Sequence, residues 1–204
     1  KSRSRGLGDV YKRQVKDKIA IAKLIDDLGV AYIEGGWPGA SPKEEEFFET
    51  AKSELNLKNA KLVSFGSTRK LDLSAGDDPQ VKALVDSGTD YVCIVGKSSK
   101  LHITKALQTD VESAIDMAVD TILYLKSKGK KVFFDAEHFF DGYKEDSVTS
   151  LKILEAVISA GTDCFIFCDT NGGTLPEEVR KVLTEIIDKY PETKFGVHFQ
   201  NDNG

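Results

Sequence analysis

The sequence lacks a long apolar run, and this absence excludes a membrane-spanning chain. No segment approaches the roughly 18 consecutive apolar residues that a bilayer crossing needs, and no apolar stretch follows the basic N-terminal residues as in a secretory signal. Proline is also scarce, with 5 Pro beside 17 Gly among 204 residues, which excludes collagen-like and Pro-rich low-complexity chains. With 40% apolar and 30% charged residues, we expect an ordinary soluble globular protein with no membrane partner and no secretion.

Cysteine is scarce as well. The three cysteines, Cys93, Cys164 and Cys168, lie in apolar stretches without CxxC spacing. Such cysteines are typical of buried thiols in a reducing compartment rather than of disulfides or a zinc site. We therefore expect the protein in the cytoplasm or in an organelle matrix.

An excess of positive charge is missing, because the formal net charge is −5. Residues 1–14 hold five basic residues and one acid, so the remainder of the chain carries −9. Because the remainder of the chain is acidic, it has no excess of basic residues to bind the phosphates of a nucleic acid. We therefore expect no nucleic-acid partner. The basic segment lacks apolar periodicity and is similar to translated adapter sequence. We interpret residues 1–14 as an adapter-derived or disordered head, with a natural basic arm as the alternative.

Residues 15–204 alternate between helix-period segments and short runs rich in β-branched and aromatic residues. This alternation is typical of a parallel sheet covered by helices. The predicted strands cover residues 30–37, 61–67, 91–97, 131–140, 164–170 and 194–200. The predicted helices lie near residues 15–28, 42–54, 79–87, 110–128, 146–160 and 176–190.

The spacing of these strands predicts the fold class. They begin roughly every 30 residues, which is the spacing expected when about 250 residues form eight βα units. A doubly wound sheet would gather its functional residues at one switch point, whereas here nearly every predicted strand ends in polar side chains. We predict an α/β fold, a truncated TIM (β/α)8 barrel in which residues 15–204 form a partial catalytic domain with strands two to seven.

A metal site is predicted at the last strand. His198 and Gln200 lie two residues apart, so their side chains point to the same side. The amide oxygen of Gln200 suits a hard cation such as Mg²⁺ better than Mn²⁺ or Zn²⁺. Alternatively, His198 forms only hydrogen bonds within the rim, and the spacing leaves both interpretations open.

Acidic side chains at strand ends are candidates for acid–base or positioning chemistry. Asp135 and Glu137 share one face of the predicted fifth barrel strand, and His138 lies on the other. Carboxylates there are costly unless they are paired or coordinated. Glu34 lies next to two glycines that allow close approach of a ligand. It is therefore a further candidate for acid–base or positioning chemistry. A structural ion pair is the alternative interpretation.

Two basic residues at strand ends could bind anions. Arg69 can clamp a carboxylate in bidentate fashion. Lys97 can bind an anion, or form a Schiff base if it is desolvated. A solvated loop position is the alternative for each, and the glycines form neither GxGxxG nor a Walker A loop.

Six segments in order resemble citramalate synthases, which belong to a superfamily of TIM-barrel enzymes with isopropylmalate and homocitrate synthases and hydroxymethylglutaryl-CoA lyase. The segments are IEGGWPGASPKEEEFF, KLVSFGSTRK, VGKS, DAEHFFDGYKED, DTNGGTLP and GVHFQNDNG. The resemblance implies a Claisen-type condensation of acetyl-CoA with pyruvate to citramalate, on the way to isoleucine. It also implies a divalent metal, Mg²⁺ or Mn²⁺ with Zn²⁺ as the alternative, acetyl-CoA as co-substrate, and a homodimer for the full-length protein.

The same resemblance suggests individual roles. His198 matches the family's first metal histidine, Glu137 its glutamate near the oxo-acid site, and Thr170 a threonine that contacts the substrate carboxylate. Asn171, in the motif of Thr170, is also expected to bind substrate. Gln200 departs from the pattern, since it occupies the position of the second metal histidine.

A second departure concerns the family's opening DTTLRDG-type motif, which should precede Val15 and is absent. We therefore expect this chain to be inactive on its own. The alternatives for the complete protein are an isopropylmalate or homocitrate synthase, a hydroxyacyl-CoA lyase, a Schiff-base aldolase that uses Lys97, and an inactive acyl-CoA-binding homologue.

Overall fold

The computed structural model describes residues 5–200, with side chains from Gln14 onward. Its strands are β1 (Tyr32–Glu34), β2 (Lys61–Ser67), β3 (Tyr91–Lys97), β4 (Lys131–Glu137), β5 (Cys164–Asp169) and β6 (Phe195–Phe199). Its helices are α1 (Arg5–Asp27), α2 (Pro42–Glu54), α3 (Pro79–Asp86), α4 (Lys100–Lys105), α5 (Val111–Ser127), α6 (Phe139–Ser159) and α7 (Pro176–Lys189). Among these helices, none is both long and apolar enough to cross a membrane.

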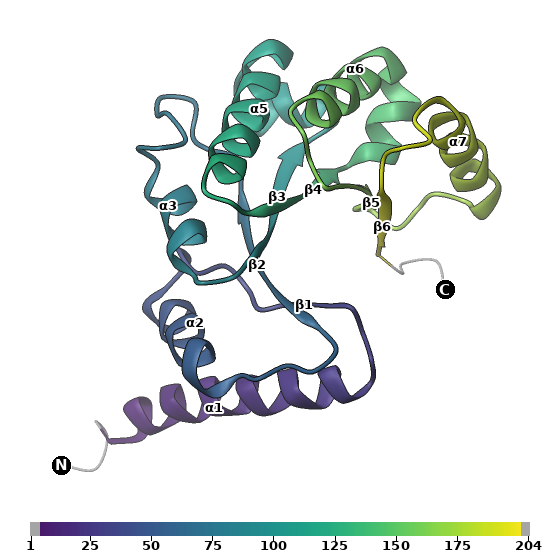
Figure 1. Cartoon of the computed structure of the whole chain (residues 1–204). Helices are drawn as coiled ribbons and strands as arrows, with labels where there is room; N and C mark the ends of the chain where they lie inside the picture. Colours follow the sequence, from purple (N-terminus) through teal and green to yellow (C-terminus); the bar gives the residue numbers. More distant parts are fainter. Residues whose placement is uncertain (1–4, 201–204) are drawn as a thin grey trace.

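The six strands form one parallel sheet in the order of the sequence, β1-β2-β3-β4-β5-β6. Figure 1 shows them as a curved row with the helices around its outer side and its concave side open. Sequential parallel strands joined by helices are the arrangement of a TIM barrel. The predicted α/β partial barrel of six consecutive strands is therefore confirmed.

Strand alternation divides each strand between the helices and the concave side. In β4, Val132, Phe134 and Ala136 are completely buried in the main hydrophobic core. The intervening residues Asp135 and Glu137 consequently face the concave side, because successive strand side chains point in opposite directions. The packing of apolar residues against the helices thus directs the polar residues to the open side.

Capping residues begin two of the helices close to their predicted positions. The Ser41 hydroxyl accepts the N–H of Glu44 at 3.4 Å, and Pro42 occupies the first turn of α2, where its missing N–H has no cost. The carboxylate of Asp110 accepts the N–H of Ser113 at 2.7 Å at the start of α5. These local contacts explain why the helix starts could be predicted from the sequence.

The prediction of a strand over 131–140 was wrong at its end. The strand stops at Glu137, and His138 adopts the left-handed conformation with φ 57°. Phe139 and Phe140 then begin α6 and are buried in the core. His138 therefore lies in a sharp turn rather than on the opposite face of the strand. The turn allows both phenylalanines to bury their rings in the core from the first turn of α6.

Helix boundaries differ from the prediction in three further places. Helix α1 begins at Arg5, well before the expected start at Val15, whereas the origin of residues 1–14 stays a prediction. Helix α6 spans the predicted loop before residue 146 and is kinked at Asp146, with φ −151° and ψ 84°. The short α4, which has no side-chain cap, was missed.

Asp26 anchors the loop that precedes β2, and we expect its contribution to stability to depend on pH. The buried carboxylate accepts the backbone N–H groups of Lys58, Asn59 and Ala60 at 2.7, 2.9 and 2.6 Å. These hydrogen bonds, that of Lys58 first, lower the pKa of Asp26 below its ordinary value of 3.8. The stabilisation is therefore complete above that value and is lost as the pH falls through the lowered pKa.

Accordingly, Asp26→Asn should lower the urea midpoint near neutral pH, and the difference from the unaltered chain should shrink in acid. The measurement is urea unfolding of both proteins at neutral pH and below the lowered pKa. Asp27→Asn, at the exposed neighbouring position, serves as the control. A difference between Asp26→Asn and the unaltered chain that is equal at both pH values would contradict this role.

Candidate functional site

Three potential metal ligands converge on the concave side of the sheet. Asp135 comes from β4, Cys168 from β5 and His198 from β6, and one ligand atom of each lies within 4.8 Å of the others. His198 lies beside Cys168 in the β5–β6 register, and its Nδ1 atom is 3.1 Å from Oδ2 of Asp135. The residues predicted separately for catalysis, Asp135, and for metal binding, His198, therefore belong to one cluster.

Burial and neighbouring acids control protonation in this cluster. Burial raises the pKa of the Cys168 thiol, and the carboxylate of Asp135 raises it further. The pKa of Glu34 is raised first by partial removal from water and then by Asp135. Burial and Asp135 also raise the pKa of Cys93 well above its ordinary value. A divalent cation would neutralise this concentration of acidic groups, and the oxygen, nitrogen and sulfur donors fit such an ion.

Lys97 and Glu137 form an ion pair at the carboxyl ends of β3 and β4. They are neighbours in the parallel register and line a cavity of about 550 Å³ with Ser67, Arg69 and Met117. A Schiff-base lysine needs a free amine, so an ion-paired ammonium does not support the aldolase interpretation. Glu137 is instead placed as a carboxylate beside a cation at the wall of a cavity.

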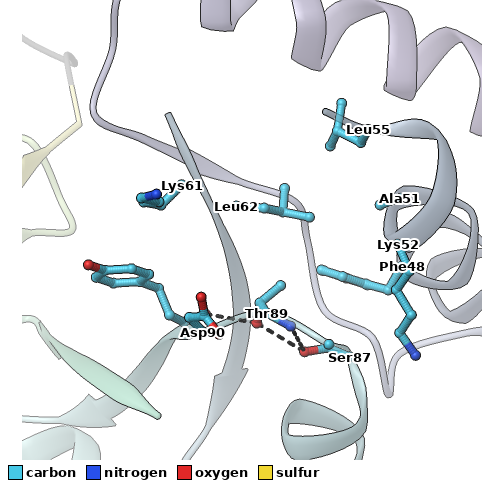
Figure 2. Close-up of a pocket in the computed structure, with 11 residues that line it drawn as sticks. Phe48, Ala51, Lys52, Leu55, Lys61, Leu62, Ser87, Thr89 and Asp90 are labelled. Atoms are coloured by element: carbon cyan, nitrogen blue, oxygen red, sulfur yellow. Dashed lines mark hydrogen bonds between the residues drawn. The ribbon is translucent and has the colours of Figure 1, made fainter. Parts of the chain in front are cut away.

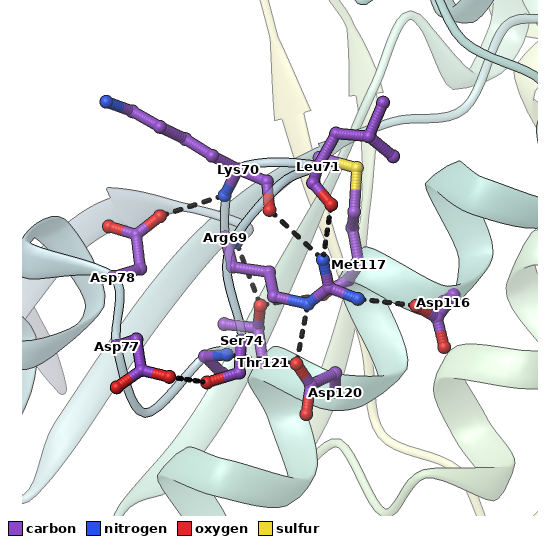
Figure 3. A network of polar contacts seen from close by, with 11 residues as sticks. Arg69, Lys70, Leu71, Ser74, Asp77, Asp78, Asp116, Met117, Asp120 and Thr121 are labelled. Atoms are coloured by element: carbon purple, nitrogen blue, oxygen red, sulfur yellow. Dashed lines mark hydrogen bonds and ion pairs between the residues drawn. The ribbon is translucent and has the colours of Figure 1, made fainter.

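Arg69, the predicted substrate clamp, pairs with acids of a neighbouring helix. Its guanidinium forms ion pairs with Asp116 and Asp120 of α5, the second at 2.5 Å from Nε to Oδ2. Figure 3 shows the side chain enclosed between these carboxylates and the loop after β2. The backbone N–H of Arg69 also donates to the Thr121 hydroxyl at 2.9 Å. These contacts anchor the loop after β2 to α5, and a substrate contact of Arg69, which also lines the cavity, stays a prediction.

His138 lies beside a histidine to which the sequence analysis assigns no role. Its ring stacks on that of His102 from α4, with 3.6 Å between ring centroids and 19° between planes. Burial, followed by the nearby His138 and Lys97, lowers the pKa of His102. The sequence contains no local signal for this pair, because the contact joins a short helix to the turn after β4.

The loop after β5 brings Thr170 and Asn171 to the start of α6. The Thr170 hydroxyl accepts the backbone N–H of His138 at 2.8 Å, and the Asn171 amide donates to the carboxylate of Asp141 at 2.7 Å. Gln200 is exposed, and its backbone N–H donates to the Asp169 carbonyl at 3.2 Å. Substrate contacts of Thr170 and Asn171 and a metal contact of Gln200 stay predictions.

A family model described as HMGL-like matches residues 10–204, nearly the whole chain. The chain belongs to the HMGL-like family. This membership agrees with the partial barrel and with a polar site at the carboxyl ends of its strands, the face at which such barrels hold their active sites. The family assignment thus supports the position of the candidate site in this HMGL-like chain.

Curated relatives separate the branches of the family. (R)-Citramalate synthase of Aquifex aeolicus is 47% identical over 189 residues, which cover 93% of this chain and 36% of the relative. The enzyme of the same name from Streptomyces coelicolor is 44% identical over 93% of this chain and 35% of the relative. Homocitrate synthase of Sulfolobus acidocaldarius is 28% identical over 92% of this chain and 38% of the relative. The resemblance to citramalate synthases is confirmed, and the HMGL-like chain spans about a third of these relatives' length.

Solved structures support the fold of the HMGL-like chain. The hydroxymethylglutaryl-CoA lyase of Bacillus subtilis aligns with a TM-score of 0.74 at 17% identity, covering 93% of this chain and 63% of that one. The lyase of Acinetobacter baumannii, solved with coenzyme A and 3-methylmalate, aligns with a TM-score of 0.73 at 17% identity, covering 93% and 61%. At this identity the likeness concerns the fold alone.

A second cavity of the HMGL-like chain, of about 240 Å³, lies at the amino ends of β2 and β3, away from the candidate site. Figure 2 shows its wall formed by Phe48, Leu55 and Leu62 and by the hydroxyls of Ser87 and Thr89. These hydroxyls lie 3.0 Å apart, and the Thr89 carbonyl accepts Lys130 Nζ at 2.6 Å. Residues at this face of a barrel stabilise the fold, and we therefore place the site at the carboxyl ends.

Proposed function

We propose that this chain is the central part of the barrel of a citramalate synthase, an acyltransferase that condenses acetyl-CoA with pyruvate. The observation that supports the proposal most strongly is the difference in identity between branches. Five citramalate synthases are 40–47% identical to this chain over 92–93% of its length, whereas three homocitrate synthases are 27–28% identical. We further propose a homodimer for the complete protein.

The metal belongs at the cluster on β4, β5 and β6. His198 and Asp135 would hold a divalent ion there, and Gln200, two residues after His198, is the proposed neighbouring contact. Such an ion would act as a Lewis acid that polarises the ketone of the oxo acid. Glu34 of β1, whose pKa responds to Asp135 and His198, would supply a further carboxylate near such an ion.

Glu137 is the proposed general base. The reaction requires removal of a proton from the acetyl methyl group, so that the resulting enolate attacks the ketone carbon of pyruvate. Water then cleaves the thioester of the condensation product, which releases citramalate and free CoA. The carboxylate of Glu137 accepts that proton, and the ion pair with Lys97 orients it toward the cavity.

Thr170 and Asn171 would bind the carboxylate of the oxo acid. The Thr170 hydroxyl accepts from His138 and so keeps its own proton to donate, and the Asn171 amide has a second N–H beside the one directed at Asp141.

The test is an assay of a chimera in which this chain replaces the corresponding segment of the Aquifex aeolicus relative, because the chain spans only 36% of that enzyme. Release of free CoA should be faster with pyruvate than with 2-oxoisovalerate or 2-oxoglutarate, and should be abolished by a chelator. The unaltered relative is the control for folding and assay conditions. A folded chimera that prefers another oxo acid, or that only cleaves hydroxyacyl-CoA, would refute the assignment.

A further inference from the structure

The turns that follow β3 and β4 are joined by several contacts beside the candidate site. The backbone N–H of Ser98 donates to the carbonyl of Glu137 at 3.0 Å, and the side chains of Lys97 and Glu137 form an ion pair. The hydroxyl of Ser150 on α6 donates to the Ser98 carbonyl at 2.9 Å. Gly142 lies so close that a Cβ atom there would meet this carbonyl at 2.6 Å. The two turns therefore form one closely packed unit that includes Glu137.

His138, the residue directly after Glu137, has a strained backbone. Its φ of 57° and ψ of 33° lie in the left-handed region, which side-chain-bearing residues rarely adopt. Its N–H donates to the Thr170 hydroxyl at 2.8 Å. Such a conformation persists only where the surrounding structure overdetermines it, and this is frequent at functional sites. The strained turn therefore fixes the backbone of Glu137 from its C-terminal side.

The ring of His138 is held by stacking rather than by hydrogen bonding. His138 is 9% exposed, and its Nδ1 atom, 3.5 Å from Oδ2 of Asp141, has no hydrogen-bond partner among the described residues. The ring lies instead nearly parallel to that of His102, with 3.6 Å between centroids and 19° between planes. His102 belongs to α4, which begins just after Ser98. The stack is therefore a further link between the turns after β3 and β4.

The electrostatic surroundings keep His102 uncharged at neutral pH. Burial, followed by His138 and Lys97, lowers the pKa of His102 below its ordinary value of 6.5. The nearby acids Glu137 and Asp141 act in the opposite direction but have smaller effects. A neutral ring can stack without adding a positive charge that would compete with Lys97 for the carboxylate of Glu137. The pair of histidines therefore leaves the Lys97–Glu137 ion pair intact.

We propose that the stack of His102 on His138 positions Glu137, by holding the turn after β4 so that the carboxylate faces the cavity in its ion pair with Lys97. The proposal rests on the proposed function, in which Glu137 is the general base. Neither histidine lines the cavity that the described residues form around Lys97 and Glu137. Both are therefore positioning residues, which act through Glu137 rather than on the substrate.

The stack itself is tested in the 204-residue chain by NMR of its 3 histidines. The ring protons of His102 should be shifted upfield by the ring current of His138, and His102 should titrate below its ordinary pKa of 6.5. His138→Asn tolerates the left-handed backbone but lacks the imidazole. It should therefore abolish the upfield shift and raise the pKa of His102. Unshifted His102 signals in the folded, unaltered chain would overturn the proposal.

The positioning role is tested in the chimera with the Aquifex aeolicus relative. His102→Ala should lower kcat for pyruvate-dependent CoA release about 10- to 100-fold and change KM for pyruvate less than about twofold. His102→Phe keeps a flat ring that can stack, and it should retain most of kcat. Leu101→Ala, at a 48% exposed position of the same helix, is the control and should leave kcat unchanged. Circular dichroism and urea unfolding check that each variant is folded.

His138→Gly separates the ring from the backbone, because glycine adopts the left-handed conformation without strain. If the stack positions Glu137, this variant should lose kcat although its turn is relieved of strain. Full kcat in His138→Gly would show that the ring is not needed and would overturn the proposal. A His102→Phe variant as slow as His102→Ala would also overturn it, since the imidazole would then act by more than stacking.

The outcome is separable from that of the proposed function. A chimera that is active with pyruvate and unaffected by His102→Ala would leave the function in place and refute the positioning role alone. An unaltered chimera that is folded but releases no CoA with any oxo acid would refute the function, and the positioning role with it, even where NMR detects the stack.

Discussion

Glu137→Gln should lower the rate of pyruvate-dependent CoA release by the chimera about 10²- to 10⁴-fold, the contribution expected of a general base. The amide has nearly the shape of the carboxylate but cannot accept the methyl proton at neutral pH. The ion pair with Lys97 would be lost, yet both side chains are partly exposed at the cavity wall. The fold should therefore remain, and the effect should fall on kcat more than on KM for pyruvate.

A matched control exists on the helical surface. Glu112 of α5 also pairs with a lysine, Lys152 of α6, but both side chains are exposed. Glu112→Gln removes the same charge from the same kind of pair and should change the rate less than about twofold, since exposed pairs contribute little. A loss below about tenfold in Glu137→Gln would show that another group removes the proton.

Phe167→Ala should lower the free energy of unfolding of this chain by about 3–5 kcal/mol. The ring is completely buried, and its centroid lies 4.8 Å from that of Phe139, 5.0 Å from Phe165 and 5.3 Å from Phe195. Truncation removes the transfer free energy of the ring and leaves a cavity among three aromatic side chains that are themselves fixed by strands and a helix. Urea unfolding followed by circular dichroism measures the loss.

Leu123→Ala provides the comparison for this prediction. Leu123 lies on α5 and is 53% exposed, so its truncation should change the free energy of unfolding by no more than about 0.5 kcal/mol. A loss of about 1 kcal/mol or less in Phe167→Ala would mean that the aromatic cluster relaxes into the space. In that case Phe167 would not be the residue whose packing holds Cys168 on the concave side.

The sequence by itself determined the order and type of most elements. Strand and helix periods are local properties, and the positions of residues such as Val132 and Phe134 in their strands already indicate which side is apolar. The same alternation places Asp135 and His198 on the polar side. A rim of polar strand ends, and hence a site at the carboxyl face, follows from this pattern once the sheet is parallel.

Only the tertiary structure decided which of these polar residues meet. Asp135 and His198 are 63 positions apart, and their contact depends on the register of β4, β5 and β6 and on the curvature of the sheet, which periodicity does not report. For the same reason the sequence did not show which acids pair with the two basic residues of the cavity wall. Arg69 pairs with acids of α5, and Lys97 pairs with Glu137. Packing of distant elements also ended β4 at Glu137 and brought Cys168, which the sequence places in an ordinary apolar run, next to Asp135 and His198.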